Sequence, residues 1–345
     1  MRRFSAQVVA PISIPLIAFP KAWSPTLGPT PLEDEIVHVD IKKTEDFEKY
    51  RGKLKGKIVL DGSPIDLKLR FEPYALRRAE TNLLALANSD GTAFRNSTAA
   101  ANAANPTSAA AAANLATPEQ RAATALTPQR YQFFSEEGVA VLLQPSRIGD
   151  AGTLFTAAAI VYPPRGQKAP PPPKATDEKG KKKSAPPIRN ISAWKTDAPP
   201  IIPQITLAAE HFNRLVRLAQ AGEKVRVAVE LQSEYFTKDL MSANVVAEIP
   251  GTDLADEIVM LGAHLDSWHS GTGATDNAAG SAVVMEAMRL IQTLGLKPRR
   301  TIRVALWTGE EQGLLGSKAY VAAHFGAPKT PAASATGDAT DPASF

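Results

Sequence analysis

Two short stretches of the sequence concentrate side chains that could bind a metal ion. The first is "LGAHLDSWHSGTGATDNAAGS", residues 261–281, in which His264, Asp266 and Asp276 stand among glycines and other small residues. The second is "LWTGEEQGLLGS", residues 306–317, which contains the adjacent pair Glu310 and Glu311. One imidazole among several carboxylates is a donor set that suits zinc or another divalent metal such as manganese or cobalt.

Electrostatics indicates that these carboxylates have different roles at a metal. Two adjacent glutamates repel each other strongly if both are buried without a cation. With a metal present, one glutamate can bind it while the other stays free as a base, and a further carboxylate can bridge two metals. Asp266 stands two residues after His264, so in an extended chain it projects to the same side and can orient the imidazole. Each feature alone is more typical of a turn, a helix cap or a solvated surface, but their combination favours a metal site.

The elements around the two stretches indicate how they meet. "EIVMLGAHLD" is a continuous apolar run, typical of a strand that is buried on both faces, and residues 278–294 carry apolar side chains at helical spacing. "RTIRVALWT" predicts another strand, and residues 313–325 predict another helix. This alternation indicates an α/β fold with parallel strands, in which ligands lie beyond the carboxyl ends of the strands. We therefore expect all five candidate residues to meet in one crevice.

The rest of the chain divides by composition. Residues 1–45 are rich in proline and are expected to be irregular. Residues 46–200 predict a small β-rich domain with strands within 52–62 and 136–146, a short helix near 74–87, and low-complexity insertions at 97–130 and 165–189. Residues 201–326 begin with a helix at 207–221 and a half-buried strand at 223–231, and they end in the site. Residues 327–345 are of low complexity and indicate either a disordered tail or a truncation.

Composition excludes several classes of function. The absence of cysteine among 345 residues removes disulfides, thiolate zinc sites and cysteine nucleophiles. The net charge is +4, but the eight basic and two acidic residues of 165–189 lie in a proline-rich segment, which is typical of a solvated linker and not of a nucleic-acid-binding face. No 18-residue apolar run predicts a membrane span. Three prolines interrupt the apolar start of the chain, so no clear signal peptide is expected.

The joint motifs resemble those of a known family. "GAHLDSWHSGTGATDNAAGS" followed by "LGLKPRRTIRVALWTGEEQGLLGSKAY" is similar to the di-zinc exopeptidases of metallopeptidase family 28, most of all to its carboxypeptidase Q-like branch. The likeness is dense from about 244 to 325. Upstream, "YRGKLKGKIVL" and "EEGVAVLLQ" look like pieces of the protease-associated domain that interrupts the peptidase domain in this branch. The resemblance implies a mixed sheet with flanking helices and this inserted β-rich domain.

The resemblance also implies roles and cofactors. His264 would bind one zinc, Asp276 would bridge two zincs, and Glu311 would bind the other. Glu310 would be the general base that takes a proton from the attacking water, and Asp266 would support His264 from behind. Such a site, with two zincs when complete, would hydrolyse terminal residues of short peptides. The parent protein would be secreted, periplasmic or lysosomal, and a homodimer stays open.

The sequence also departs from the family pattern. The family adds another aspartate after the glutamate pair and a histidine near the C-terminus, whereas here Asp338 and Asp341 lie in low-complexity sequence and no histidine follows His324. His269 stands where the family often carries an acid, and we expect it at the rim. We therefore expect a partial copy that binds metal weakly and exposes apolar surface. Two alternatives stay open: a non-catalytic binding or scaffold protein with a degenerate peptidase half, and a zinc enzyme that cyclises N-terminal glutamine.

Overall fold

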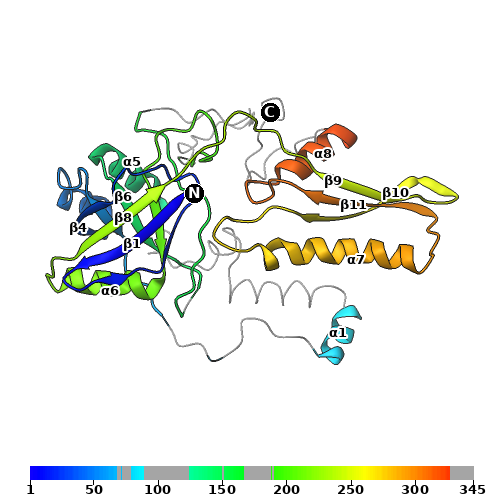
Figure 1. Cartoon of the computed structure of the whole chain (residues 1–345), viewed down its shortest axis with the longest axis horizontal. Coiled ribbons are helices and arrows are strands. Elements are labelled where there is room, and N and C mark those ends of the chain that lie inside the picture. The colour runs from blue at the N-terminus through cyan, green and yellow to red at the C-terminus, as the bar shows by residue number, and fades with distance from the viewer. Residues whose placement is uncertain are drawn as a thin grey trace, which may run out of the picture. The chain divides into compact units, whose positions relative to one another are not determined.

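The chain forms two compact units, each a mixture of strands and helices. The structure, a computed structural model, describes residues 1–67, 71, 79–88, 124–149, 151–166, 188 and 190–326. Unit 1 contains the described residues up to Gln232, and unit 2 contains those from Ser233 onward (Figure 1). The expected α/β class is confirmed. Most of the two expected low-complexity insertions, and the whole of 327–345, lie outside the described residues.

Unit 1 is built on an eight-stranded sheet of order β2-β1-β8-β4-β5-β6-β7-β3. Strands β4 to β7 run parallel to one another, and the flanking pairs are antiparallel. The strand bounds are β1 (Arg3–Ala10), β2 (Ile14–Pro15), β3 (Ala18–Pro20), β4 (Leu32–Val39), β5 (Ile58–Asp61), β6 (Val141–Pro145), β7 (Gln204–Leu207) and β8 (Arg226–Gln232).

Helices cover both faces of this sheet. On one face α6 (Ala209–Gln220) buries Phe212, Leu215 and Val216 against the strands, as the helical spacing predicts. On the other face α5 (Thr127–Glu137) and the short 3₁₀ helix η1 (Thr44–Lys49) pack against β5 and β6, with Phe133 and Phe47 buried. A short helix, α1 (Glu80–Ala87), is described within the segment where one was expected. Unit 1 therefore has a hydrophobic core on each side of its sheet.

The structure corrects the expected organisation of the N-terminal half. Residues 1–45 are not irregular, because β1 and β4 lie within them and both pair with β8. Alternate residues of β1 face the core, and Ala6 and Val8 are buried, which overrides the proline-rich composition. Since β8 lies between β1 and β4, the boundary between the units is at 232/233 and not at 200/201.

One predicted strand is shorter than expected, and one predicted insertion ends in a helix. Residues 136 and 137 close α5, which begins at Thr127 within the expected insertion. Gly138 then adopts a left-handed conformation with φ of 69°, where a glycine is favoured, and this ends the helix. The strand β6 starts only at Val141.

Unit 2 contains a three-stranded sheet of order β10-β11-β9. β10 (Leu254–His264) is parallel to β11 (Arg300–Trp307), and β9 (Val245–Ile249) is antiparallel to β11. The turn η2 (Ala274–Ala279) leads into α7 (Gly280–Thr293), and α8 (Leu315–Phe325) follows β11. Figure 1 shows α7 and α8 on opposite sides of this sheet. These elements match the predicted strand, helix, strand, helix order.

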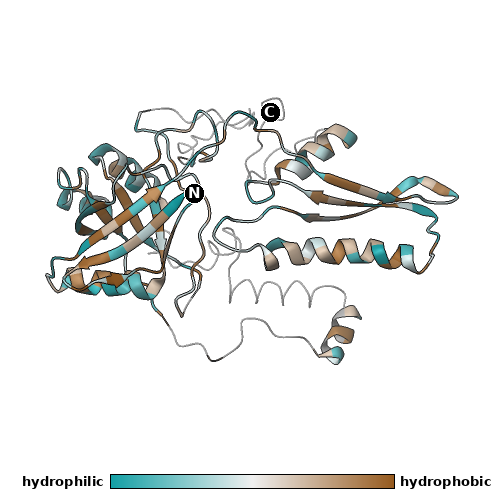
Figure 2. Cartoon of the chain, in the orientation of Figure 1, coloured by the Kyte–Doolittle hydropathy of each residue, from teal (hydrophilic) through white to brown (hydrophobic). Residues whose placement is uncertain are grey.

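The expected burial of β10 on both faces is wrong. Ile258, Val259 and Met260 are 44, 46 and 37% exposed, and within the described residues β10 pairs with β11 alone. A strand with one neighbour leaves its other edge, and much of its apolar surface, uncovered. The apolar residues visible along this sheet (Figure 2) agree with the expectation of exposed apolar surface. Over the described residues, no helix has the length and apolarity needed to cross a bilayer.

The difference in burial predicts different mutational costs for two valines. Val229 of β8 is fully buried, whereas Val259 of β10 is nearly half exposed. We expect Val229→Ala to destabilise unit 1 by about 2 kcal/mol because it leaves a cavity. Val259→Ala should change the stability of unit 2 by less than about 0.5 kcal/mol. Native-state hydrogen exchange of backbone amides measures each unit separately, and equal losses at the two sites would contradict the assignment of β10 as an uncovered strand.

Candidate metal centre

The two parallel strands of unit 2 end at the same edge and so bring the two motif stretches together. His264 is the last residue of β10 and lies in register with Trp307, the last residue of β11. The backbone N–H of Leu265 donates to the Trp307 carbonyl at 2.7 Å, which extends the pairing by one residue. The loop that carries Glu310 and Glu311 starts immediately after this pair. The sheet edge therefore carries both halves of the site, as predicted.

A glycine makes room for the side chain that packs across the strand pair. A Cβ atom on Gly262 would lie 2.6 Å from Nε1 of Trp307, which is closer than real contacts allow. The Trp307 ring in turn packs against Tyr320 of α8, with 5.2 Å between ring centroids. The glycine of the "LGAHLD" stretch thus lets the indole lie across β10 and helps to position α8.

Hydrogen bonding orients the imidazole of His264. Its Nδ1 lies 3.0 Å from the backbone carbonyl oxygen of Asp266, which can only accept a hydrogen bond. A neutral imidazole that donates from Nδ1 keeps the lone pair of Nε2 free for a metal. Nε2 lies 3.2 Å from Oδ1 of Asp276 and 3.7 Å from Oε2 of Glu310. The ring therefore presents its ligating nitrogen to the carboxylates.

The side chain of Asp266 does more than sequence reasoning anticipates. Its Oδ1 accepts from the backbone N–H of Glu310 at 3.0 Å, and its Oδ2 accepts from the backbone N–H of Glu311 at 3.1 Å. Oδ1 also lies 3.6 Å from Nδ1 of His264. One carboxylate thus binds the glutamate loop to the end of β10. No sequence pattern predicts a hydrogen bond from a side chain to backbone amides that lie 44 and 45 residues away in the chain.

Asp276 approaches His264 and Glu311 from the turn before α7, and these three residues form the cluster. Gly273, with φ of 70°, precedes it in a left-handed conformation, and Asp276 itself is non-helical, with φ of −117° and ψ of 93°. Its side chain is 70% exposed, so it borders the cluster on the solvent side. The ligand atoms of His264, Asp276 and Glu311 all lie within 4.8 Å of one another.

Glu311 carries the observation that best tests whether a cation fits. Its Oε1 is buried and has no hydrogen-bond partner. Burial raises the pKa of Glu311, the negative charges of Asp276 and Glu310 raise it further, and His264 opposes the rise. A buried carboxylate oxygen that faces other carboxylates is costly without a positive charge. The donor set of one imidazole and two carboxylates therefore fits a divalent metal such as zinc.

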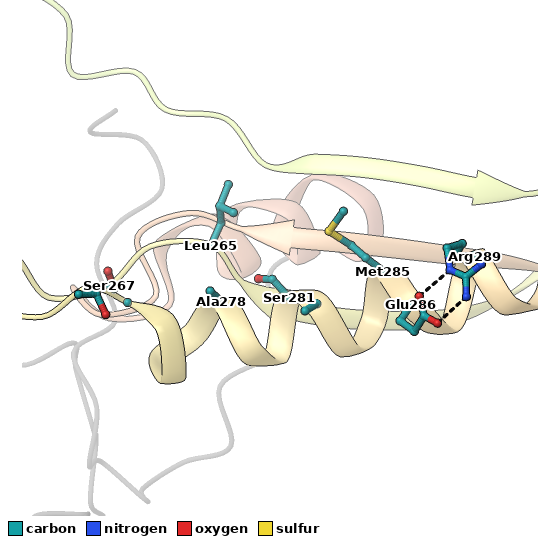
Figure 3. Close-up of a pocket in the computed structure, with 10 residues that line it drawn as sticks. Leu265, Ser267, Ala278, Ser281, Met285, Glu286 and Arg289 are labelled. Carbon is teal, nitrogen blue, oxygen red and sulfur yellow. Dashed lines mark hydrogen bonds and ion pairs between the residues drawn. The ribbon is translucent and has the colours of Figure 1, made fainter.

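A serine that the sequence analysis overlooks ties α7 to the strand end. The buried Ser281 donates its hydroxyl to the backbone carbonyl of His264 at 3.0 Å. Ser281 also lines a hollow of about 640 Å³ along α7, together with Leu265, Ser267 and Met285, while Glu286 and Arg289 form an ion pair in its lining (Figure 3). None of the five candidate site residues lines this hollow.

The other histidines lie elsewhere. His269 is exposed in the loop after Asp266 and is not one of the three clustered residues, in keeping with a rim position. His38 and His211 make hydrogen bonds in unit 1, to the carbonyl of Gly62 and from the N–H of Ile17. His324 packs against Tyr320 in α8.

Comparison with known proteins identifies the segment that carries the site. The model of "Peptidase family M28" matches residues 244–336. Residues 244–336 are thus similar to peptidase family M28. This segment contains β9, β10, β11, the glutamate loop and all five candidate residues. The resemblance seen in the motifs is thus confirmed for this part of the chain.

Individual relatives agree with this assignment. The chain is 39% identical to mouse carboxypeptidase Q over 128 residues, which are 37% of the chain and 27% of that protein. It is 38% identical to leucine aminopeptidase 2 of Trichophyton equinum over 120 residues, which are 35% of the chain and 23% of that protein. The chain thus matches about a quarter of the length of these relatives.

A solved structure shares the fold. The peptidase M28 precursor of Shewanella amazonensis aligns with 94% of the chain and 55% of its own length, with a TM-score of 0.53 and 23% sequence identity. The alignment extends well beyond the 244–336 segment. It confirms a mixed α/β fold with flanking helices.

The buried charge of Glu311 predicts an unusual pH dependence of the metal-free chain. Because its folded-state pKa lies above the ordinary 4.5, the fold binds this proton more tightly than the unfolded chain does. Stability should therefore fall as pH rises from about 4 through the raised pKa. Glu311→Gln removes the charge and should raise the thermal midpoint of unit 2 at pH 7 by about 4–8 °C for each kcal/mol relieved, with little effect at pH 4.

Glu286→Gln is the matched control for this measurement. Glu286 is an exposed glutamate whose pKa is lowered by its hydrogen bond to Arg289, so its removal should not raise the midpoint. Differential scanning calorimetry in the presence of a chelator, between pH 4 and 7, measures both variants. A Glu311→Gln midpoint that does not exceed the wild-type value at pH 7 would show that burial of this carboxylate is not costly.

Proposed function

We propose that this chain carries the metal centre of a zinc-dependent exopeptidase that hydrolyses terminal residues of short peptides. The observation that carries the proposal is the grouping of His264, Asp276 and Glu311 within 4.8 Å, inside the segment that matches the model of peptidase family M28. The names of its relatives include both a carboxypeptidase and an aminopeptidase. Both names describe enzymes that remove a residue from one end of a peptide.

His264, Asp276 and Glu311 would hold the metal. The buried, unpartnered Oε1 of Glu311 and the Nε2 of His264, which faces the carboxylates, support these two as ligands. Asp276, on the exposed side, would be the carboxylate that a second zinc could share. Bound zinc supplies Lewis acidity, which polarises a carbonyl group and lowers the pKa of water.

Glu310 would act as the general base. Its Oε2 lies 3.7 Å from Nε2 of His264, so its carboxylate borders the ligand group without being one of the three clustered residues. The bond from its backbone N–H to Asp266 holds the start of its side chain in place. From this position Glu310 would take a proton from the attacking water at a carboxylate oxygen and return it to the leaving amine.

Three narrower features of the proposal rest on the family resemblance alone. Unit 1 would be the protease-associated domain of the enzyme, since "YRGKLKGKIVL" and "EEGVAVLLQ" both lie in it. The enzyme would work outside the cytoplasm, as a secreted, periplasmic or lysosomal protein, and two copies would form a homodimer. Expression of the gene with its full reading frame, followed by cell fractionation and light scattering, tests location and assembly.

Replacement of the proposed base should separate metal binding from turnover. Glu310→Gln keeps the shape of the side chain but cannot accept a proton, so we expect unchanged zinc content and a loss of about 10²–10⁴-fold in kcat. Hydrolysis of a panel of dipeptides by this chain, and by the longest product of its reading frame, measures kcat, and plasma emission spectroscopy measures zinc. Unchanged turnover in an active preparation would remove Glu310 as the base.

Replacement of the imidazole should affect the metal first. His264→Ala removes the only histidine of the cluster, and we expect zinc affinity to fall by about 100-fold or more in equilibrium dialysis. His211→Ala, in unit 1, is the control and should leave affinity unchanged. If the wild-type chain and its longest product bind no zinc and cleave no peptide, the non-catalytic binding protein becomes the better interpretation.

A further inference from the structure

The loop that presents Glu310 and Glu311 is held closed at its base by one side chain from the residue before another strand. Asn244 precedes β9 and is partly buried. Its Oδ1 accepts a hydrogen bond from the backbone N–H of Thr308 at 3.1 Å, and its Nδ2 donates to the backbone carbonyl of Gly316 at 3.0 Å. Thr308 follows the last residue of β11, and Gly316 is the second residue of α8. These two residues bound the segment that we call the 308–316 loop, so a single carboxamide bonds to both of its ends.

The two ends of the loop also bond to each other. The N–H of Gly316 donates to the carbonyl of Thr308 at 2.9 Å, and the N–H of Leu315 donates to the carbonyl of Gly309 at 3.0 Å. The Asn244 carboxamide adds bonds to the N–H of Thr308 and to the C=O of Gly316. An amide is suited to the position because it offers one donor and one acceptor on the same small group.

The space around the carboxamide admits little variation. A Cβ atom on Gly316 would lie 2.2 Å from Oδ1 of Asn244 and 2.6 Å from the carbonyl oxygen of Thr308. The glycine therefore lets Asn244 approach the backbone closely. The hydroxyl groups of Ser242 and Thr308 form a further hydrogen bond at 2.6 Å beside this contact.

We propose that Asn244 is a positioning residue of the metal centre, which holds the 308–316 loop closed so that Glu310 and Glu311 face His264 and Asp276. Asp266 fixes the middle of the loop through the N–H groups of both glutamates, and Asn244 fixes its base. The proposal rests on the metal site proposed above. The two hydrogen bonds of the Asn244 side chain go to Gly316 and Thr308 and not to the ligands, so it would act through the loop that carries them.

The test measures metal binding and folding separately. Co²⁺, whose visible absorption reports its coordination, is titrated into the full chain and into Asn244→Ala. We expect the variant to bind Co²⁺ about tenfold or more weakly, as when partners that orient metal ligands are removed. Its far-UV circular dichroism should match the wild type. A lower thermal midpoint with unchanged Co²⁺ affinity would show a structural role only and would overturn the proposal.

An isosteric variant excludes a purely electrostatic explanation. Asn244→Asp keeps the acceptor for Thr308 but places a carboxylate oxygen against the carbonyl of Gly316. Its added negative charge alone would strengthen cation binding, whereas the loss of loop closure would weaken it. We expect weaker binding, and stronger or equal binding would contradict the positioning role.

Two controls keep this result distinct from a failure of the proposed function. Gln292→Ala removes a carboxamide that is exposed on α7, and it should leave Co²⁺ affinity unchanged. A wild-type chain that binds neither Co²⁺ nor Zn²⁺ would refute the metal site itself. A wild-type chain that binds Co²⁺ as tightly as Asn244→Ala does would leave the metal site intact and refute only the role of Asn244.

Discussion

The carboxylate of Asp266 is the interaction on which the arrangement of the metal centre depends. It follows the end of β10 and accepts the backbone N–H groups of Glu310 and Glu311, which follow the end of β11. Parallel pairing brings the two strand ends to one edge, but it leaves the loops beyond them free to adopt many conformations. Two hydrogen bonds to a charged acceptor remove that freedom where the glutamate side chains begin. The backbone carbonyl of the same residue also orients His264.

Within the part of the chain that the structure describes, this arrangement gathers four carboxylates around one imidazole, with no lysine or arginine in an ion pair with them. Asp266, Asp276, Glu310 and Glu311 surround one histidine, and the buried Oε1 of Glu311 has no partner. Structural ion-pair networks normally place a cationic side chain against such an oxygen, as Lys57 stands against Asp34 in unit 1. Within the described residues, the imidazole of His264, and not a lysine or arginine, faces the carboxylates of the candidate metal centre. The cost of holding the carboxylates together without a cation is the physical reason to expect a bound metal.

Much of this site was predictable because its main determinants are local in sequence. Hydrophobic periodicity predicts β11, α7 and α8, and parallel strands imply that His264 and the glutamate pair share an edge. The bonds made by Asp266, Asn244 and Ser281 were not predictable, because they join side chains to backbone groups 17 to 72 residues away. The strands within residues 1–45 were missed for a related reason: β1 is stabilised by pairing with β8, more than 200 residues later. The burial of β10 was misjudged because an apolar run indicates which residues a strand can bury. It does not indicate how many neighbouring strands and helices cover that strand.

The two units differ in how their apolar residues are covered, and this difference gives the metal a second role. In unit 1 the central strands are buried on both faces by α5 and α6, so hydrophobic burial alone accounts for their order. In unit 2 the strand that ends in His264 has exposed apolar residues and one paired edge. A ligand that binds only the folded form stabilises it by mass action, and a metal shared by His264, Asp276 and Glu311 would join β10, the turn before α7 and the loop after β11. Metal binding and folding of unit 2 would then be coupled, so that the residues which form the site also stabilise the elements that carry it.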